Sequence, residues 1–342
     1  MDNDRNLLSL SAQELAELVT RLGDKKFRAD QIFGWLGKGA ASLDEMTNVP
    51  LALRNALTDA GYYIGQPDVI TEQISKTDGT RKCLYGFRDG ARVESVFMKY
   101  SYGNSICISS QVGCRMGCTF CASTIGGKER DLTSGEMLGE VLRMRRHTGE
   151  DINHVVIMGM GEPFDNYEEV AGFLRLINSP KGVNLSLRNV TVSTCGIIPM
   201  IRRFGEEFPQ VNLAVSLHAP NDEIRRRTMP VAKKYPFSDL IRACREYTDR
   251  THRRITFEYA LIRDVNDSKE NARELAENLR GWLTHVNLIP LNEVRGREYR
   301  TSEGTSVLQF RKELEDRGIA VTVRRTLGSD IDAACGQLRA GR

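Results

Sequence analysis

The stretch NSICISSQVGCRMGCTFCAS, residues 104–123, runs from a short apolar segment into a loop that carries three cysteines. The cysteines follow the spacing Cys-x3-Cys-x2-Cys, at Cys114, Cys118 and Cys121, and Gly113 and Gly117 let the backbone wrap around them. Four thiolates would complete a tetrahedral zinc site, whereas three leave one position vacant. Three cysteines on a [4Fe–4S] cluster leave one iron free to bind a further ligand. We therefore expect an iron–sulfur cluster, with zinc and a fourth ligand from elsewhere as the alternative.

From this stretch to the end of the chain, apolar, β-branched segments alternate with segments of helical periodicity. The strand-like segments lie at residues 104–110, 153–160, 188–194, 211–218, 253–261, 285–291 and 319–325. The helical segments lie at residues 133–147, 166–178, 237–250, 268–282 and 306–318. Repeated βα units predict an α/β fold, in which a parallel sheet is covered by helices on its outside. The number of strands suits a full or partial (β/α) TIM-like barrel, which we expect over residues 100–325.

The first hundred residues do not follow this alternation. Residues 1–65 carry helix signals, such as Ser11 followed by Glu14 three residues later and by Gly23 as a stop. Residues 66–99 change to a period of two, with an Asp-Gly turn that is typical of a β-hairpin. We therefore expect a small helical accessory domain, a β-hairpin extension, the barrel and a C-terminal tail at residues 326–342.

Polar and glycine-rich residues gather directly after five of the predicted strands. These groups lie at residues 111–123, 159–163, 193–196, 216–218 and 290–292. Barrel enzymes place their chemistry at the carboxyl ends of the strands. The five groups therefore predict one shared site that includes the three cysteines.

Composition and charge limit the classes of function. The 342 residues carry a formal net charge of +3, which is too small for a protein that coats nucleic acid by charge alone. Basic runs such as residues 225–227 suit a polyanionic partner, and solvated helix faces explain them equally well. No signal-peptide pattern and no apolar run of membrane-spanning length is visible, so we expect a cytoplasmic protein with no membrane partner. The eight cysteines are then expected to be reduced thiols.

Three motifs together resemble a known family. The cysteine spacing after the first barrel strand resembles the radical SAM enzymes, and GMGEP at residues 159–163 is similar to their SAM-binding segment. With GSDIDAACGQL at residues 328–338, the resemblance narrows to the bacterial adenine methyltransferases of the RlmN and Cfr group. It extends to the N-terminal helical module, which looks like the RNA-binding accessory domain of that group. It implies a radical SAM barrel and an RNA methyltransferase.

The resemblance also implies roles for individual residues. Cys114, Cys118 and Cys121 would hold a [4Fe–4S] cluster, with S-adenosyl-L-methionine (SAM) on the open iron. Cys335 would carry the methyl group as S-methylcysteine, Cys107 would form a transient disulfide with it, and Glu94 would accept a proton. The residues that would line SAM are Gly161, Glu162, Ser193, Ser216, Leu217, His218 and Asn292.

The reaction implied by the resemblance is methylation at C2 of adenine 2503 of 23S rRNA and of adenine 37 of tRNAs, with two SAM per turnover and a transient protein–RNA adduct. Adenine C2 has no nucleophilic lone pair, so it cannot attack a SAM methyl group directly and a radical route is needed. The base must leave its stack to reach a buried radical, so we expect an unstacked or loop nucleotide as target. The implied partners are 23S rRNA, tRNA and an electron donor such as flavodoxin or ferredoxin.

Two other functions stay open at this point. Methylation at C8 of adenine, as in the Cfr branch, would use the same catalytic residues. A metal-stabilised RNA-binding factor without turnover would also need the clustered cysteines. Without the resemblance, Cys107 is typical of a core thiol, Cys335 of a helix-packing cysteine and Glu94 of a solvated strand face.

Overall fold

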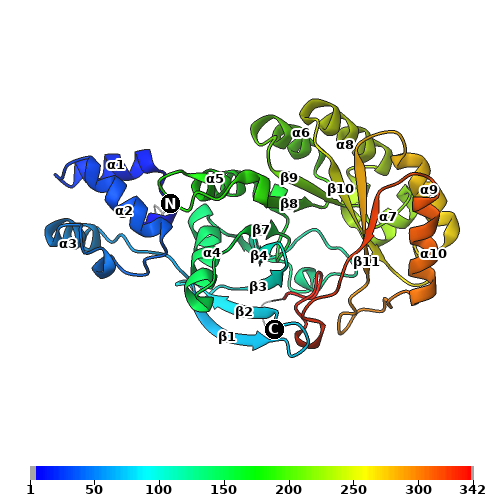
Figure 1. Cartoon of the computed structure of the whole chain (residues 1–342), viewed down its shortest axis with the longest axis horizontal. Coiled ribbons are helices and arrows are strands. Elements are labelled where there is room, and N and C mark those ends of the chain that lie inside the picture. Colours follow the sequence, from blue (N-terminus) through cyan, green and yellow to red (C-terminus); the bar gives the residue numbers. More distant parts are fainter. Residues whose placement is uncertain (1–4, 340–342) are drawn as a thin grey trace.

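The structure is a computed structural model that describes residues 5–339, with a helical N-terminal part beside a large mixed sheet (Figure 1). The strands are β1 (Asp68–Ile74), β2 (Arg81–Gly86), β3 (Arg92–Tyr100), β4 (Gly103–Ile108), β5 (Gln111–Gly113), β6 (Lys128–Asp131), β7 (His154–Ile157), β8 (Val190–Thr194), β9 (Asn212–Ser216), β10 (Ile255–Leu261), β11 (Thr284–Pro290) and β12 (Val321–Val323). The α-helices are α1 (Ala12–Arg21), α2 (Phe27–Gly37), α3 (Leu51–Asp59), α4 (Ser134–Thr148), α5 (Tyr167–Asn178), α6 (Ile198–Glu207), α7 (Asp222–Thr228), α8 (Phe237–Thr251), α9 (Lys269–Leu279) and α10 (Gly304–Glu315).

The large sheet has ten strands in the order β1-β2-β3-β4-β7-β8-β9-β10-β11-β12. From β4 to β12 neighbouring strands are parallel and follow one another along the chain, as in a (β/α) barrel. β1, β2 and β3 extend the β4 edge with antiparallel pairs. β1 and β12 are the two edges of the sheet, so strand pairing does not close the barrel. This confirms the predicted α/β fold with a partial barrel.

The N-terminal helices pack directly on the barrel. α1 begins with the predicted capping box, in which Ser11 and Glu14 bond each other's backbone N–H groups. Gly37, at the end of α2, lies against Gly182 in the loop after α5, and a Cβ atom at Gly37 would be 2.4 Å from the Gly182 carbonyl carbon. Glycine at this position therefore allows the two backbones to touch.

Four elements were not anticipated from the sequence. α7 has seven residues, and β5 and β6 have only three and four. Such lengths carry too few periods for a hydrophobic pattern to stand out. α6 has ten residues, as many as α1, so its length does not explain why it was not predicted. β5 and β6 pair with each other and enclose the cysteine loop.

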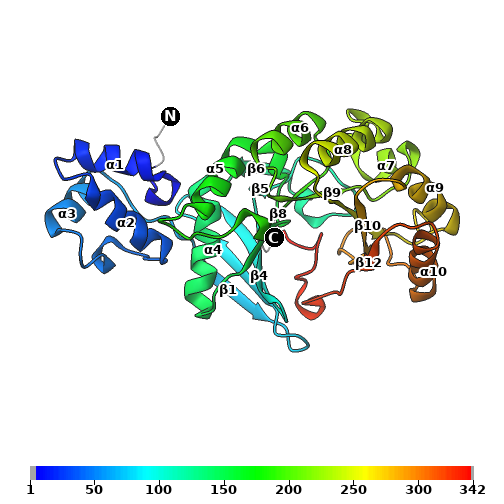
Figure 2. The ribbon, with the colours of Figure 1, turned by 45° about the horizontal axis from the view of Figure 1, so that its top comes forward.

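The C-terminal tail, residues 324–339, lies across the gap between the β1–β2 extension and β12 (Figure 2). The Gly328 N–H donates to Asp78 Oδ2 at 2.9 Å, and the Lys76 N–H donates to Asp330 Oδ2 at 2.9 Å. The tail thus bonds to the turn between β1 and β2 and covers the open side of the barrel.

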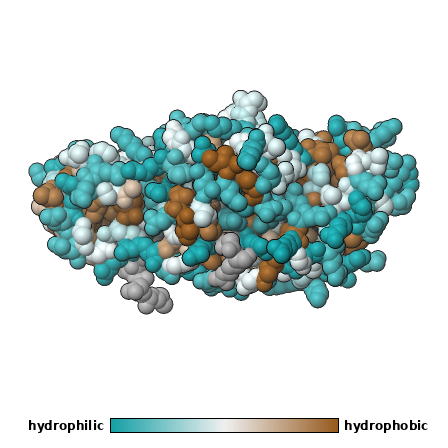
Figure 3. Space-filling view, turned by 90° about the horizontal axis from the view of Figure 1, so that it is seen from below, coloured by the Kyte–Doolittle hydropathy of each residue, from teal (hydrophilic) through white to brown (hydrophobic). Residues whose placement is uncertain are grey.

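The face of the molecule shown in Figure 3 is mostly hydrophilic, and its apolar side chains lie in separate patches. Among residues 5–339, no helix is both long enough and apolar enough to cross a membrane.

A buried carboxyl group lies between α4 and the sheet. Glu140 is fully buried, and it accepts hydrogen bonds from the Ser95 hydroxyl and, at 3.1 Å, from the Ser109 N–H. Its other oxygen has no hydrogen-bond partner in the described chain. Burial raises the pKa of Glu140 from 4.5 to about 8, although both hydrogen bonds lower it.

This pKa predicts that Glu140→Gln stabilises the protein in a pH-dependent way. Below pH 4.5 the carboxyl group is protonated in the folded and unfolded states, so its contribution to stability is fully present there. As the pH rises, the unfolded state ionises first, and stability is lost until the folded carboxyl ionises near pH 8. Thermal unfolding should show the variant a few kcal/mol more stable than wild type at pH 8, with the gap closing toward pH 4.5. Parallel pH profiles would show that Glu140 is already ionised when folded.

Candidate functional site

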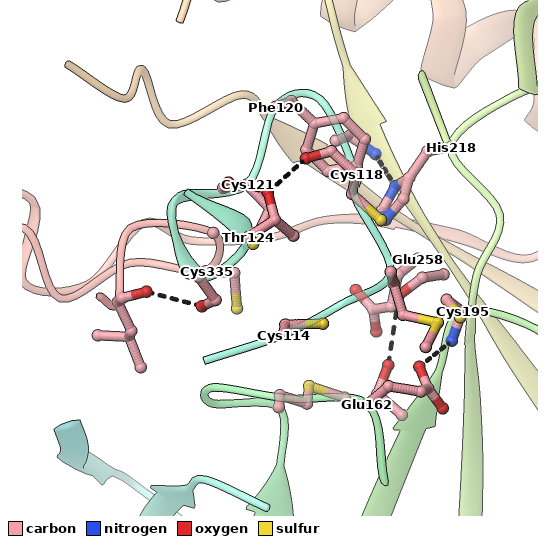
Figure 4. A pocket seen from close by; sticks show the side chains of 18 of the residues that line it. Cys114, Cys118, Phe120, Cys121, Thr124, Glu162, Cys195, His218, Glu258 and Cys335 are labelled. Atoms are coloured by element: carbon pink, nitrogen blue, oxygen red, sulfur yellow. Dashed lines mark hydrogen bonds between the residues drawn. The ribbon is translucent and has the colours of Figure 1, made fainter. Parts of the chain in front are cut away.

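A cavity at the carboxyl ends of the parallel strands contains the three clustered cysteines (Figure 4). Its walls come from the loop after β4, from the ends of β7, β8, β9 and β11, and from the C-terminal tail. The predicted residues in its wall are Cys114, Cys118, Cys121, Gly161, Glu162, Ser193, Ser216, His218, Asn292 and Cys335. Leu217 is not among them, because its side chain is fully buried in the hydrophobic core. The structure therefore brings together side chains from all five polar groups that follow predicted strands.

A close backbone approach fixes the base of the cysteine loop. The Cys114 N–H donates to the Gly127 carbonyl at 2.9 Å. Gly113 has a φ of 76°, and a Cβ atom there would lie only 1.9 Å from the same carbonyl oxygen. Any side chain at this position would push β5 and β6 apart, so the loop requires glycine.

Thr124 and Arg297 hold the other side of the loop. The Thr124 hydroxyl lies 3.1 Å from the Cys118 carbonyl and 3.0 Å from the Cys121 carbonyl. Arg297, which follows β11, donates to the Cys121 carbonyl at 3.2 Å and to the Thr124 hydroxyl at 2.9 Å. Because protein groups satisfy these carbonyls, the loop keeps its shape while its sulfurs remain available as ligands.

The three sulfurs fit a cluster better than a single ion. Tetrahedral zinc with bonds of about 2.3 Å would bring its sulfur ligands to about 3.8 Å from one another. Among residues 5–339, the three loop cysteines do not form a group whose ligand atoms all lie within 4.8 Å. Burial raises the pKa of Cys114 to about 12 and also raises the pKa of Cys118 and of Cys121. Thiolates at these three positions therefore need a positively charged group beside them, and the spacing of the sulfurs suits an iron–sulfur cluster.

Glu72, Cys83 and His147 do place their ligand atoms within 4.8 Å of one another, on the β-hairpin extension and α4. Glu72 Oε1 is bonded to Arg81 Nη1 at 3.0 Å and to His147 Nε2 at 3.1 Å. Burial raises the pKa of Cys83 to about 12, so its thiol stays protonated. The Arg81 guanidinium therefore supplies the positive charge that a metal ion would supply. We interpret Glu72, Cys83 and His147 as part of an ion-paired cluster and not as a metal site.

Glu162 presents a fixed carboxylate at the end of β7. It accepts hydrogen bonds from the Thr194 hydroxyl at 2.7 Å, from the Cys195 N–H at 2.7 Å and from the backbone two residues on at 3.0 Å. Burial raises its pKa, and the three hydrogen bonds oppose that shift. Gly161, with φ 107°, lies so close to Gln111 that a Cβ atom would be 2.7 Å from the Gln111 Cβ. Gly161 lines the cavity beside the Glu162 carboxylate, and the three hydrogen bonds fix the orientation of that carboxylate.

His218 contributes a neutral imidazole. It has a left-handed φ of 52°, and its Nδ1 accepts the Ala260 N–H at 2.8 Å. Burial lowers its pKa to about 3, so the ring is uncharged and its Nε2 carries the proton. Its ring meets the edge of Phe120 with 5.0 Å between centroids.

Hydroxyl and amide groups complete the wall. Ser193 and Ser216 end neighbouring strands with their hydroxyls 3.4 Å apart. The Asn292 side chain donates to the Cys335 carbonyl at 3.1 Å. These groups suit a polar ligand with hydroxyl and carboxylate functions.

The tail holds Cys335 next to the cysteine loop. The Ala122 N–H donates to the Gly336 carbonyl at 2.7 Å, and the Ser123 hydroxyl donates to the Leu338 carbonyl at 2.7 Å. Figure 4 shows the Cys335 side chain beside the loop that carries Cys121.

Cys107 and Cys335 line a second, smaller cavity that adjoins the first. Both are free thiols, and Cys107 is buried on β4. Arg324 lines both cavities, and the pKa of its guanidinium is raised, first of all by the nearby Cys335. Burial raises the pKa of the Cys107 thiol, and the positive charge of Arg324 opposes that shift.

Glu94 lies beyond the walls of both cavities. Its Oε2 accepts the Arg339 N–H at 2.8 Å, and its Oε1 is 3.6 Å from Lys82 Nζ. Alternate residues of β3 face the same side, and Val96 and Met98 line the cavity of Cys107. The Glu94 carboxylate is therefore buried next to that cavity, under the end of the tail.

Gln111, Thr194 and Arg324 are not among the site residues predicted from the sequence. Gln111 accepts the Glu162 N–H at 2.9 Å, and Thr194 bonds the Glu162 carboxylate. All three lie at the start, at the end of or directly after a strand, which is the only sequence signal that they carry. Their partners are far away in the chain, so their roles appear only in the folded structure.

Similarity to known proteins extends over almost the whole chain. Residues 108–276 match the Radical SAM superfamily, and residues 5–62 match the Ribosomal RNA large subunit methyltransferase N-terminal domain. The probable dual-specificity RNA methyltransferase RlmN of Clostridium tetani is 48% identical over 99% of this chain and 97% of its own length. The protein of the same name from Alkaliphilus oremlandii is 50% identical over 98% and 97%. The crystal structure of a radical SAM methyltransferase from Sphaerobacter thermophilus matches with a TM-score of 0.94 and 44% identity, over 98% and 99% of the two chains.

Two glycines of the cysteine loop provide a matched test of its geometry. Gly113→Ala should lower the iron bound after anaerobic reconstitution several-fold, because its Cβ atom collides with the Gly127 carbonyl. Gly126→Ala should bind iron as wild type does, because nothing lies within 4 Å of a Cβ atom there. Iron content and visible absorption per folded chain measure both. Equal iron in the two variants would mean that the loop tolerates separation of β5 and β6.

Proposed function

The chain belongs to the RlmN family of radical SAM RNA methyltransferases, and from that membership we propose that it methylates C2 of adenine 2503 in 23S rRNA and of adenine 37 in tRNA. The observation that supports this proposal is that the three loop cysteines and the pair Cys107 and Cys335 lie around adjoining cavities. Cys335 lines the cavity of the three loop cysteines and also the adjoining cavity of Cys107. A methyltransferase that attacks SAM directly with its substrate needs neither set.

The residues around the first cavity suit SAM and a cluster. Cys114, Cys118 and Cys121 would hold a [4Fe–4S] cluster with SAM on its open iron. When bound, the cluster would supply the electron that splits SAM into methionine and a 5′-deoxyadenosyl radical, and would take back one electron at the end. Glu162 and the Gly161 backbone offer acceptors for an ammonium group. We propose a flavodoxin or ferredoxin as the electron donor, which places the reaction in the cytoplasm.

Cys335 is proposed to receive the methyl group first. Its thiolate attacks the methyl carbon of SAM in the cavity that Arg324 also lines, so that an S–CH3 bond forms and S-adenosylhomocysteine leaves. A hydrogen atom of this S-methyl group then passes to the 5′-deoxyadenosyl radical of a second SAM. The remaining S–CH2 radical adds to C2 of adenine, a carbon that is too electron-poor to attack SAM itself.

Release of the product would use Cys107 and Glu94. The adduct loses one electron and the C2 proton, and Glu94 is the nearby buried base. The Cys107 thiolate then attacks the Cys335 sulfur, so that an S–S bond forms and the S–CH2 bond breaks. The electron pair goes to the carbon, which takes up a proton and becomes the methyl group. An external thiol would reduce the disulfide for the next turnover.

Nucleoside mass analysis tests this function. The protein, reconstituted anaerobically, is incubated with SAM, dithionite and either a 23S rRNA fragment or a tRNA. We expect 2-methyladenosine after digestion of each RNA. 8-Methyladenosine would refute the C2 assignment, and unmodified RNA with intact SAM cleavage would refute the function.

The two cysteines should fail at different stages. Cys335→Ala should bind iron normally and give neither methylated protein nor product, because Cys335 is not a cluster ligand. Cys107→Ala should methylate Cys335 and then stop with RNA attached to the protein, because no thiolate can displace the carbon. A denaturing gel should show this adduct as a shifted band that disappears with nuclease.

Cys244→Ala serves as the control, since Cys244 is buried in α8 away from both cavities. It should turn over as wild type does. Normal turnover by Cys107→Ala, or an adduct in Cys335→Ala, would contradict the proposed division of roles.

A further inference from the structure

A third cavity lies at the opposite ends of the barrel strands from the cysteine loop. Thr191, Asn212 and Thr256, from the amino-terminal ends of β8, β9 and β10, line it together with Arg253 and Arg254. Its volume is about 700 Å³, which is within the range of ligand sites. Of the residues given a role above, Arg324 alone lines this cavity.

The inner wall of this cavity adjoins the reactive thiols. Met158, Glu258 and Arg324 line both this cavity and the cavity of the three loop cysteines. Arg324 also lines the cavity of Cys107 and Cys335. A group that enters from this side therefore meets the neighbourhood of Cys335.

The opposite end of the barrel is covered by protein. Thr119 of the cysteine loop donates its N–H to the Thr228 carbonyl at 2.9 Å, and its hydroxyl bonds the Tyr299 hydroxyl at 3.0 Å. The tail bonds the same loop at residues 122 and 123. A nucleotide would have to displace these contacts to enter there.

The rim of the third cavity is positively charged. Arg253 donates to Asn212 Oδ1 at 2.6 Å and is fixed in place. Arg254 is exposed, and no hydrogen bond or ion pair joins its side chain to another residue in the part of the chain that the structure describes. An exposed arginine without an acidic partner is available for a phosphate group.

An aromatic platform stands beside the same rim. Tyr100 lines the cavity, and Tyr102 stacks on it with 4.9 Å between ring centroids and 10° between planes. Tyr102 is 66% exposed, the most of any large hydrophobic side chain among residues 5–339. Its ring is also met by the edge of His154 at 5.4 Å. A stacked tyrosine pair open to solvent offers a face for a nucleobase.

We propose that single-stranded RNA enters the barrel through this third cavity, with a phosphate next to the target on Arg254 and a neighbouring base stacked on Tyr102. This inference rests on the proposed function, because it takes RNA as the substrate. The target adenine, taken out of its stack, then passes between the polar walls toward Cys335. Phosphate contacts and stacking supply affinity without reading sequence, so the fold of the RNA selects the adenine.

RNA binding to the reconstituted enzyme tests the proposal. Fluorescence anisotropy would follow a labelled stem–loop RNA with an unpaired adenosine, over a range of salt concentrations. Arg254→Ala should weaken binding about fourfold at 0.15 M salt and reduce the slope of log Kd against log salt by about 0.7, as loss of one phosphate contact predicts. Tyr102→Ala should weaken binding at least about fivefold, whereas Tyr102→Phe keeps the stacking face and should bind as wild type.

Lys312→Ala on the exposed face of α10 is the control for loss of one positive charge, and it should change neither affinity nor slope. All variants should methylate Cys335 normally in the absence of RNA, as protein mass analysis would show. Wild-type affinity in both Arg254→Ala and Tyr102→Ala would overturn the proposal. So would unchanged RNA binding with impaired reduction by flavodoxin, which would assign the rim to an acidic protein.

The two proposals fail separately. If wild type forms no methylated nucleoside but the Arg254 and Tyr102 variants bind RNA more weakly, the reaction is wrong and the entry route stands. If all variants bind and methylate RNA as wild type does, the entry route is wrong and the function stands.

Discussion

The open seam of the barrel is the constraint on which the rest of the structure depends. Strand pairing ends at β12 on one side and at the β1–β2 extension on the other, so no hydrogen-bond ladder closes the sheet. The C-terminal tail fills this seam and bonds to the β1–β2 turn, to Glu94 and to the cysteine loop. The same tail therefore closes the barrel and holds Cys335 next to the three loop cysteines. A fully closed barrel would leave no place for Cys335 beside this loop.

Burial determines the chemistry of the ionisable groups in this region. Desolvation raises the pKa of the loop thiols and of Glu162, and it lowers the pKa of His218. The cavity is thus unfavourable for free negative charge unless a cation is close. Two arginines supply part of that charge. Buried Arg225 donates to the Cys195 and Leu217 carbonyls, and half-buried Arg324 lines the cavity of Cys107 and Cys335.

The two ends of the barrel carry different tasks in this view. The carboxyl ends of the strands carry the cysteine loop and the polar wall proposed to bind SAM, where barrel enzymes place their chemistry. The amino-terminal ends carry a basic, aromatic rim that adjoins the same inner residues. If RNA enters as proposed, this separation would keep its phosphates away from the thiols while the base alone reaches them. The small net charge would then be sufficient, since a local group of arginines would contact the backbone.

The sequence alone determined most of the helices and strands and the chemical class. The βα alternation predicted the parallel strands, Ser11 and Glu14 predicted the start of α1, and the cysteine spacing with its resemblance identified the radical SAM family. These signals are local, because each lies within one periodic segment or one loop. Only the tertiary structure placed Cys335 beside the loop, removed Leu217 from the wall, and joined Gln111, Thr194 and Arg324 to the site. Their partners lie tens to hundreds of residues away in the chain. A local sequence pattern cannot predict such contacts, because they form only when the tail has closed the seam of the barrel.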